Sequence, residues 1–117
     1  MPTPDYDTAF AALADPTRRA ILARLAQGAA TVTELTEAQA LAQPTISKHL
    51  KVLEAAGLVE VGRAAQRRPR RLSAAGLKQV DDWLAPFREI WTGRLDRFEA
   101  LVTAPPSEDD PERKGTT

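Results

Sequence analysis

The middle of the chain carries the clearest helical pattern. Its apolar residues recur at steps of four and three, at Ile46, Leu50 and Leu53. Pro44 suits the first turn of this helix, because its missing N–H needs no partner there. Gly57 stands where a left-handed residue usually ends a helix. The pattern therefore predicts a helix with one face in the core.

The opposite face of this helix is polar. Thr45, Ser47, Lys48 and Lys51 can all donate hydrogen bonds to phosphate oxygens or base edges. A helix with one face for the core and one for nucleic acid is what helix-turn-helix docking requires. His49 lies at the edge of the core face, where both a DNA contact and a packed, hydrogen-bonded role stay open for it.

Segments on both sides of this helix complete a recognisable unit. Residues 31–34, Thr-Val-Thr-Glu, form a capping box that opens a short helix ending near Ala40. Residues 41–43 form a turn of the length expected between two such helices. Residues 58–62 alternate like a strand, and residues 71–73 can return beside them. Helix, turn, helix and hairpin together predict a winged helix.

The tip of the predicted hairpin is strongly basic. Five arginines fall within residues 63–71, more than folding alone explains. An exposed basic tip beside a recognition helix is well placed to contact the phosphate backbone or an adjacent minor groove. We therefore predict DNA contacts from this wing at Arg63, Arg67, Arg68, Arg70 and Arg71.

Two helices are predicted ahead of the capping box. Asp15 and Pro16 mark the start of one of them, as N-cap and first helical residue, and Gly28 marks its end. A shorter helix precedes it. Arg18 and Arg19 are either phosphate contacts or two solvated arginines on a helix surface.

The last predicted helical region carries both tryptophans and two of the three phenylalanines. Ser73 can cap it, and its apolar residues follow one another at nearly heptad steps. Pro86 interrupts the pattern and is expected to kink or split the helix. So wide an apolar stripe usually marks an interface; the alternative is that the segment folds back onto its own domain. We predict dimerisation through Leu77, Trp83, Leu84, Phe87, Trp91, Leu95 and Phe98.

These elements predict a mostly α fold class with a small β-hairpin wing (α+β). Its architecture is a winged helix-turn-helix followed by a dimerisation helix. Residues 1–7 are expected to be a flexible amino terminus, and residues 8–73 the DNA-binding domain. Residues 74–102 would form the dimerisation region. Residues 103–117, which are rich in proline and acidic residues, would form a disordered tail.

Composition narrows the range of functions. The 16 basic and 16 acidic side chains cancel, but residues 15–73 alone hold 10 basic and 5 acidic ones, and local charge governs electrostatic binding. The absence of cysteine excludes disulfides and thiolate metal sites. No apolar run approaches the ~20 residues of a membrane span, and no signal peptide is recognisable. We therefore expect a cytoplasmic protein without a membrane partner.

Catalysis is not expected. One histidine, no cysteine and no glycine-rich phosphate loop leave little from which to build an active site. We expect neither an enzyme nor a cofactor. A winged helix that docks its basic wing on an acidic protein partner is the alternative to DNA binding. The donors Gln43, Ser47 and Lys48 beside five wing arginines favour DNA.

The chain resembles the ArsR family of bacterial winged-helix transcriptional repressors. The similarity is carried by residues 12–22 (Ala-Leu-Ala-Asp-Pro-Thr-Arg-Arg-Ala-Ile-Leu), 33–35 (Thr-Glu-Leu), 43–59 and 83–88. It implies a homodimer that binds double-stranded operator DNA and usually represses transcription. The family's recognition residues correspond here to Gln43, Thr45, Ser47 and Lys48, with the wing at residues 63–71.

Two departures from the family pattern matter. Ala42 stands where the family often has a capping serine, which removes a cap worth ~1 kcal/mol. Metal-sensing members use cysteines in the helix before the recognition helix, or histidine and carboxylate ligands in the last helix. Residues 33–38 contain no cysteine and residues 74–102 no histidine. The resemblance therefore implies a metal-independent member, whose small-molecule inducer, if it has one, the residues do not identify.

Overall fold

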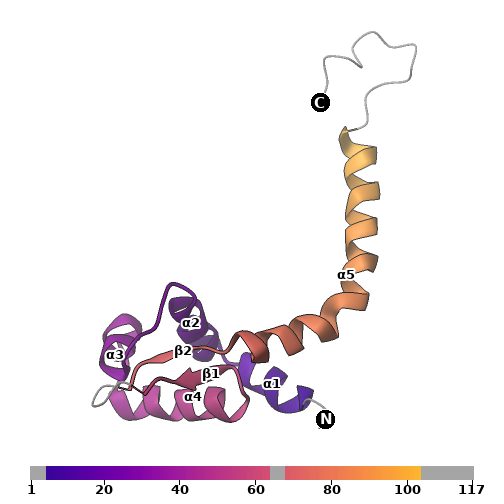
Figure 1. Ribbon diagram of the computed structural model, residues 1–117. Helices are drawn as coiled ribbons and strands as arrows, with labels where there is room; N and C mark the ends of the chain where they lie inside the picture. Colours follow the sequence, from indigo (N-terminus) through magenta and orange to yellow (C-terminus); the bar gives the residue numbers. More distant parts are fainter. Residues whose placement is uncertain (1–4, 64–67, 104–117) are drawn as a thin grey trace, which may run out of the picture. The chain divides into compact units, whose positions relative to one another are not determined.

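The computed structural model describes residues 5–63 and 68–103, which form five helices and a two-stranded sheet (Figure 1). The described residues divide after Asp82 into two compact units. The expected mostly α fold with a β-hairpin wing is confirmed. In chain order the elements are α1 (Tyr6–Leu13), α2 (Pro16–Leu25), α3 (Val32–Gln39), α4 (Gln43–Ala55), β1 (Val59–Val61), β2 (Arg70–Leu72) and α5 (Ala74–Thr103).

The core of the first unit collects side chains from α2, α3, α4 and the residue before β1. The three apolar residues predicted for the recognition helix are buried, with at most 1 % of their surface exposed. Burying one large aliphatic side chain contributes roughly 1.5–3 kcal/mol. Packing therefore determines which face of α4 turns inward. The largest fully buried side chains are Ile21, Leu35, Ile46, Leu50, Leu53 and Leu58.

Most helix ends lie at the capping residues that the sequence predicts. Asp15 caps α2 with its side chain, and Thr31 and Glu34 form both halves of the capping box on α3. The Ser73 hydroxyl accepts a hydrogen bond from the first turn of α5. Gly57 ends α4 with a φ of +76°, a conformation that favours glycine.

Two helix starts differ from the prediction. Gln43 is the first residue of α4 and does not belong to the preceding turn. Pro44 therefore occupies the second helical position, still within the first turn, where no N–H is needed. The helix α1 begins directly after its cap, Asp5. Residues 5–7, which we expected within a flexible amino terminus, thus cap or belong to a helix.

The wing is an antiparallel hairpin that is also tied to the rest of the domain. Val59 pairs with Leu72, and Val61 pairs with Arg70. Arg70 forms a second backbone bridge to Ala30, in the loop before α3, with hydrogen bonds of 2.7 and 2.9 Å. The base of the wing is therefore held from both sides.

The helix α5 runs without a break from Ala74 to Thr103, with Pro86 inside it. Of the two predicted alternatives, a split into two helices does not occur. The start of α5 belongs to the first unit, where Val80 is buried and the Ser73 amide donates to the Leu58 carbonyl at 2.9 Å. In the part of the chain that the structure describes, no helix is both long and apolar enough to cross a membrane.

Candidate nucleic-acid interface

The outer face of α4 presents a row of polar side chains. Gln43, Thr45, Lys48 and Lys51 are exposed, and Ser47 is half-buried. The same helix buries its apolar stripe on the other side. The Ala42 cap makes no side-chain hydrogen bond, as its residue type predicts. The exposed row supplies amide, hydroxyl and ammonium donors of the kind that contact phosphates and base edges.

The described wing arginines fall into two groups. Arg63 and Arg68 are exposed, and neither side chain makes a hydrogen bond or ion pair within the described residues. Arg70 pairs through Nε with Glu54 of α4 at 3.3 Å, and Arg71 pairs with Glu60 across the hairpin at 3.0 Å. The fifth candidate, Arg67, lies outside the described residues.

The ion pairs of Arg70 and Arg71 were not expected from the sequence. All five arginines were predicted to contact DNA because of their type and clustering. The carboxylates that bind Arg70 and Arg71 come from α4 and β1, so only the folded arrangement reveals them. Among the described wing arginines, Arg63 and Arg68 keep their full charge available to a partner.

An open cavity of about 530 Å³ lies where the start of α3, the start of α4 and the wing meet. The structure thereby brings Gln43 of the recognition helix and Arg68 of the wing to the rim of one hollow, although they lie 25 positions apart in the chain. The lining residues are Thr31, Val32, Thr33, Glu34, Glu37, Gln43, Arg68 and Arg70.

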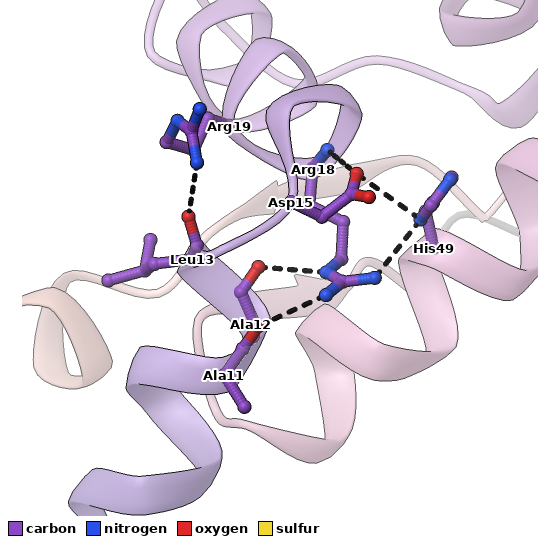
Figure 2. A network of polar contacts seen from close by, with 7 residues as sticks. All are labelled: Ala11, Ala12, Leu13, Asp15, Arg18, Arg19 and His49. Atoms are coloured by element: carbon purple, nitrogen blue, oxygen red, sulfur yellow. Dashed lines mark hydrogen bonds and ion pairs between the residues drawn. The ribbon is translucent and has the colours of Figure 1, made fainter.

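A polar network that we did not predict ties α1, α2 and α4 together (Figure 2). Arg18 donates to the backbone carbonyls that end α1 and also contacts His49 on α4. Arg19 donates to the Leu13 carbonyl at 2.9 Å. Arg18 is half-buried in this network and is neither a solvated surface residue nor a free phosphate contact. Arg19 is exposed on the helix surface, as one of the two alternatives predicted, and bonds only the end of α1 among the described residues. The side chain of His49 is 19 % exposed and contacts Arg18, which agrees with the packed, hydrogen-bonded role among the two alternatives.

Asp15 has a lowered pKa in this network. The main cause is the hydrogen bond that its carboxylate accepts from the Arg18 amide at 3.0 Å, and the nearby guanidinium charge of Arg18 lowers the pKa further. Asp15 is therefore anionic at neutral pH, and its negative charge interacts favourably with the positive amino-terminal end of the α2 dipole.

Comparison with known proteins shows the family to which the chain belongs. Residues 13–62 match the family described as "Helix-turn-helix domain". The HTH-type transcriptional regulator Rv2034 of Mycobacterium tuberculosis is 42% identical over 96 residues, which cover 82% of this chain and 87% of that protein. A crystal structure of an ArsR family transcriptional regulator is 38% identical and superimposes with a TM-score of 0.66, covering 74% of this chain and 96% of the other. This chain belongs to the ArsR family of winged helix-turn-helix transcriptional regulators.

This membership confirms that the chain is a DNA-binding regulator and not an enzyme, because the family is non-enzymatic. A further relative is a homodimeric winged helix-turn-helix DNA-binding domain from Mycobacterium bovis, solved in solution. It is 28% identical, with a TM-score of 0.57, and the match covers 80% of this chain and 82% of the other.

The part of α5 in the second unit carries an uncovered aromatic face. Trp83 and Trp91 are 42 and 43 % exposed, and Phe98 is 64 % exposed. The rings of Trp83 and Phe87 lie 4.9 Å apart between centroids and pack against each other along the helix. Large aromatic side chains rarely stay this exposed in a soluble monomer. Leu77 and Leu84 of the predicted dimer contact are half-buried, whereas Trp83, Phe87, Trp91, Leu95 and Phe98 are exposed.

Gly76, at the start of α5, was also missed by sequence reasoning. A Cβ at this position would lie 1.8 Å from the Gly57 carbonyl oxygen. The residue therefore permits close contact between α5 and the end of the recognition helix. A glycine inside a predicted helix was the available signal, since glycine is unfavourable there without a packing reason.

Proposed function

We propose that this ArsR family member is a homodimeric repressor that binds a palindromic operator. The observation that carries the proposal is the division of α4 into a buried apolar face and an exposed row of donors. In helix-turn-helix proteins such a helix enters the major groove, and its exposed side chains contact base edges. We assign this role to Gln43, Thr45, Ser47, Lys48 and Lys51.

The wing would add contacts to the phosphate backbone. Arg63 and Arg68 supply them directly, because no carboxylate of the described residues pairs with them. Arg70 and Arg71 contribute to the local positive charge but are held in part by Glu54 and Glu60. Arg67 is included from its sequence position alone.

Dimerisation through α5 would give the protein its second half-site. The uncovered aromatic face supports this assignment, as does the homodimeric state of the Mycobacterium bovis relative. One recognition helix contacts only a few base pairs, whereas two helices related by a twofold axis contact a palindrome with half-sites about one helical turn apart. Linking the two sites rigidly raises affinity without new contacts.

The regulator would not sense metal through the sites known in its family. The whole sequence lacks cysteine, and it has a single histidine, in α4. Within residues 5–63 and 68–103, no three histidine or carboxylate side chains cluster in a way that could hold a metal ion. A structural or sensory zinc site usually needs four ligands, mainly Cys or His. Any inducer would therefore be bound by other chemistry.

Selection of genomic fragments by the purified protein tests the proposal. Fragments of the source genome are bound at physiological salt, with an excess of scrambled competitor DNA, and sequenced. We expect an inverted repeat whose half-sites are about one helical turn, roughly 10 base pairs, apart. Recovery of no consistent sequence would contradict a sequence-specific regulator. Loss of the motif with Lys48→Ala, at unchanged melting temperature, would assign readout to the outer face of α4.

A further inference from the structure

One guanidinium holds the middle of the recognition helix against the junction of α1 and α2 (Figure 2). Arg18 donates from Nε to the Ala12 carbonyl at 2.8 Å and from Nη2 to the Ala11 carbonyl at 3.0 Å. Its Nη1 lies 3.3 Å from Nδ1 of His49 on α4. Three branches of one rigid group thus contact two other helices, and the group has little freedom left.

The chemistry of the third contact fixes the proton on His49. A guanidinium carries only donors, so Nδ1 of His49 must be the acceptor. The imidazole is therefore neutral in this arrangement, with its proton on Nε2. A proton added to Nδ1 would oppose the N–H groups of Arg18 and abolish the hydrogen bond.

Asp15 offers the protonated ring a different partner. Its carboxylate oxygen lies 3.9 Å from the same Nδ1. Within the described residues, Arg18 and Asp15 are the charged side chains that contact His49. From α1 the network receives the backbone carbonyls of Ala11 and Ala12. Lys48 is the charged neighbour of His49 on α4 itself. Protonation would thus exchange Arg18 for Asp15 as the partner of His49.

We propose that Arg18 and His49 are positioning residues for DNA binding, and that their contact sets the rotation of the recognition helix. Thr45 lies one turn before His49, and Lys48 directly precedes it, so a small rotation at His49 displaces both from their base or phosphate partners. This inference rests on the proposed function, because it requires α4 to be the helix that enters the DNA.

The sign of the pH dependence separates positioning from simple charge. Protonation of His49 adds a positive charge to a protein that binds a polyanion, so charge alone would strengthen binding as the pH falls. Loss of the hydrogen bond between Arg18 and His49 would instead weaken operator binding. A positioning role therefore requires operator affinity to fall when acidification protonates His49.

The experiment measures binding of the full, untagged chain to the operator duplex recovered by genomic selection, at constant salt. We expect the parent protein to bind about tenfold more weakly at pH ~5.5 than at pH ~7.5. His49→Asn keeps an acceptor where Nδ1 stands but does not titrate. It should bind like the parent at the higher pH and lose the pH dependence. An affinity of the parent protein that rises on acidification would overturn the proposal.

Arg19 provides a matched control for Arg18. Arg18→Met should weaken operator binding about tenfold at pH ~7.5. Arg19→Met removes the same charge and a bond to the end of α1, but the hydrogen bond that Arg19 makes among the described residues goes to Leu13 and not to α4. This variant should therefore bind nearly as the parent does. Equal losses in both variants would show that charge, or the stability of α1, is responsible and would contradict positioning.

A measurement without DNA distinguishes a failure of the positioning proposal from a failure of the proposed function. The chain has a single histidine, so its imidazole ¹⁵N signals need no assignment. At pH ~7.5 the parent should show the Nε2–H tautomer, and Arg18→Met should show a mixture of tautomers. An Nδ1–H tautomer in the parent would refute the contact itself. If no operator is recovered, both proposals fail, but this spectrum still shows whether Arg18 holds His49.

Discussion

Gly76 is the residue at which α5 can approach the end of the recognition helix. An added Cβ would lie 1.8 Å from the carbonyl oxygen of Gly57 and 2.8 Å from its carbonyl carbon. These are backbone atoms, and the Gly57 amide is itself bonded to the Glu54 carbonyl at 3.0 Å, so they cannot easily move. Gly76→Ala should therefore lower the free energy of unfolding by about 1–3 kcal/mol, measured by urea denaturation.

Gly93 is the matched control on the same helix. The nearest atom to a Cβ built there is Nη1 of Arg97 at 3.8 Å, an ordinary contact with a flexible side chain. Gly93→Ala should raise stability by about 0.5–1 kcal/mol, because alanine is the better helix former. Destabilisation of similar size in both variants would mean that the contact between Gly76 and Gly57 is not the cause.

Asp15 should make the stability of the domain depend on acid pH. Its folded-state pKa is lowered, chiefly by the hydrogen bond from the Arg18 amide. Its contribution is therefore fully present above the ordinary pKa and is lost as the pH falls through the lower folded value. Asp15→Asn should melt at a lower temperature than the parent at neutral pH, and this difference should shrink in acid. A melting-temperature difference that stays the same in acid would contradict this assignment.

The two residues that tie the recognition helix to its surroundings were not predictable from their types. An arginine on a helix surface and a glycine in a helix are both ordinary in a sequence. Arg18 reaches His49 across 31 positions, and Gly76 meets Gly57 across 19. Such contacts depend on how separate helices pack, which local spacing does not encode. The caps at Asp15 and Thr31 were predictable because their partners lie within one turn.

At the scale of the element, periodicity predicted α4 and α5 correctly, but the surroundings of each had to come from the structure. The stripe of α4 is buried as expected because it repeats at helical spacing. The sequence analysis placed Gln43 in the preceding turn, whereas α4 begins at Gln43. The error arises because proline is compatible with more than one position in the first turn of a helix. Proline likewise allowed either one helix or two at Pro86, and the remaining hydrogen bonds of α5 continue the helix.

The exposed aromatic face of α5 should be the dimer contact. Phe87→Asp and Trp91→Asp each place a charge where the proposed partner helix would bury it, at a cost of several kcal/mol. We expect each variant to sediment as a monomer at concentrations at which the parent is a dimer. Thr92→Asp adds the same charge to a polar, exposed position of α5 and should stay dimeric. Dimers of the Phe87 and Trp91 variants would place the interface elsewhere.

For the whole molecule, the distribution of charge matters more than its total. The 117 residues are formally neutral, yet residues 15–73 carry 10 basic and 5 acidic side chains. In the folded chain, some of these basic side chains are bound by other groups of the protein. Arg18 and Arg19 bond to backbone carbonyls, and Arg70 and Arg71 pair with carboxylates. Among the described residues of this segment, the exposed basic side chains without such a partner, Lys48, Lys51, Arg63 and Arg68, lie on α4 and the wing, and we propose that their charge serves DNA binding.

This division predicts unequal effects of the wing arginines on salt dependence. Each phosphate contact contributes about 0.9 to the slope of log affinity against log salt concentration. Arg63→Ala and Arg68→Ala should each flatten the slope by about that amount, because both side chains are exposed and their charge is uncompensated. Arg71→Ala should change it less, since Glu60 already binds that guanidinium at 3.0 Å. The measurement is a titration of the operator duplex at several salt concentrations. Equal flattening by all three variants would mean that Arg71 leaves Glu60 for phosphate when DNA binds.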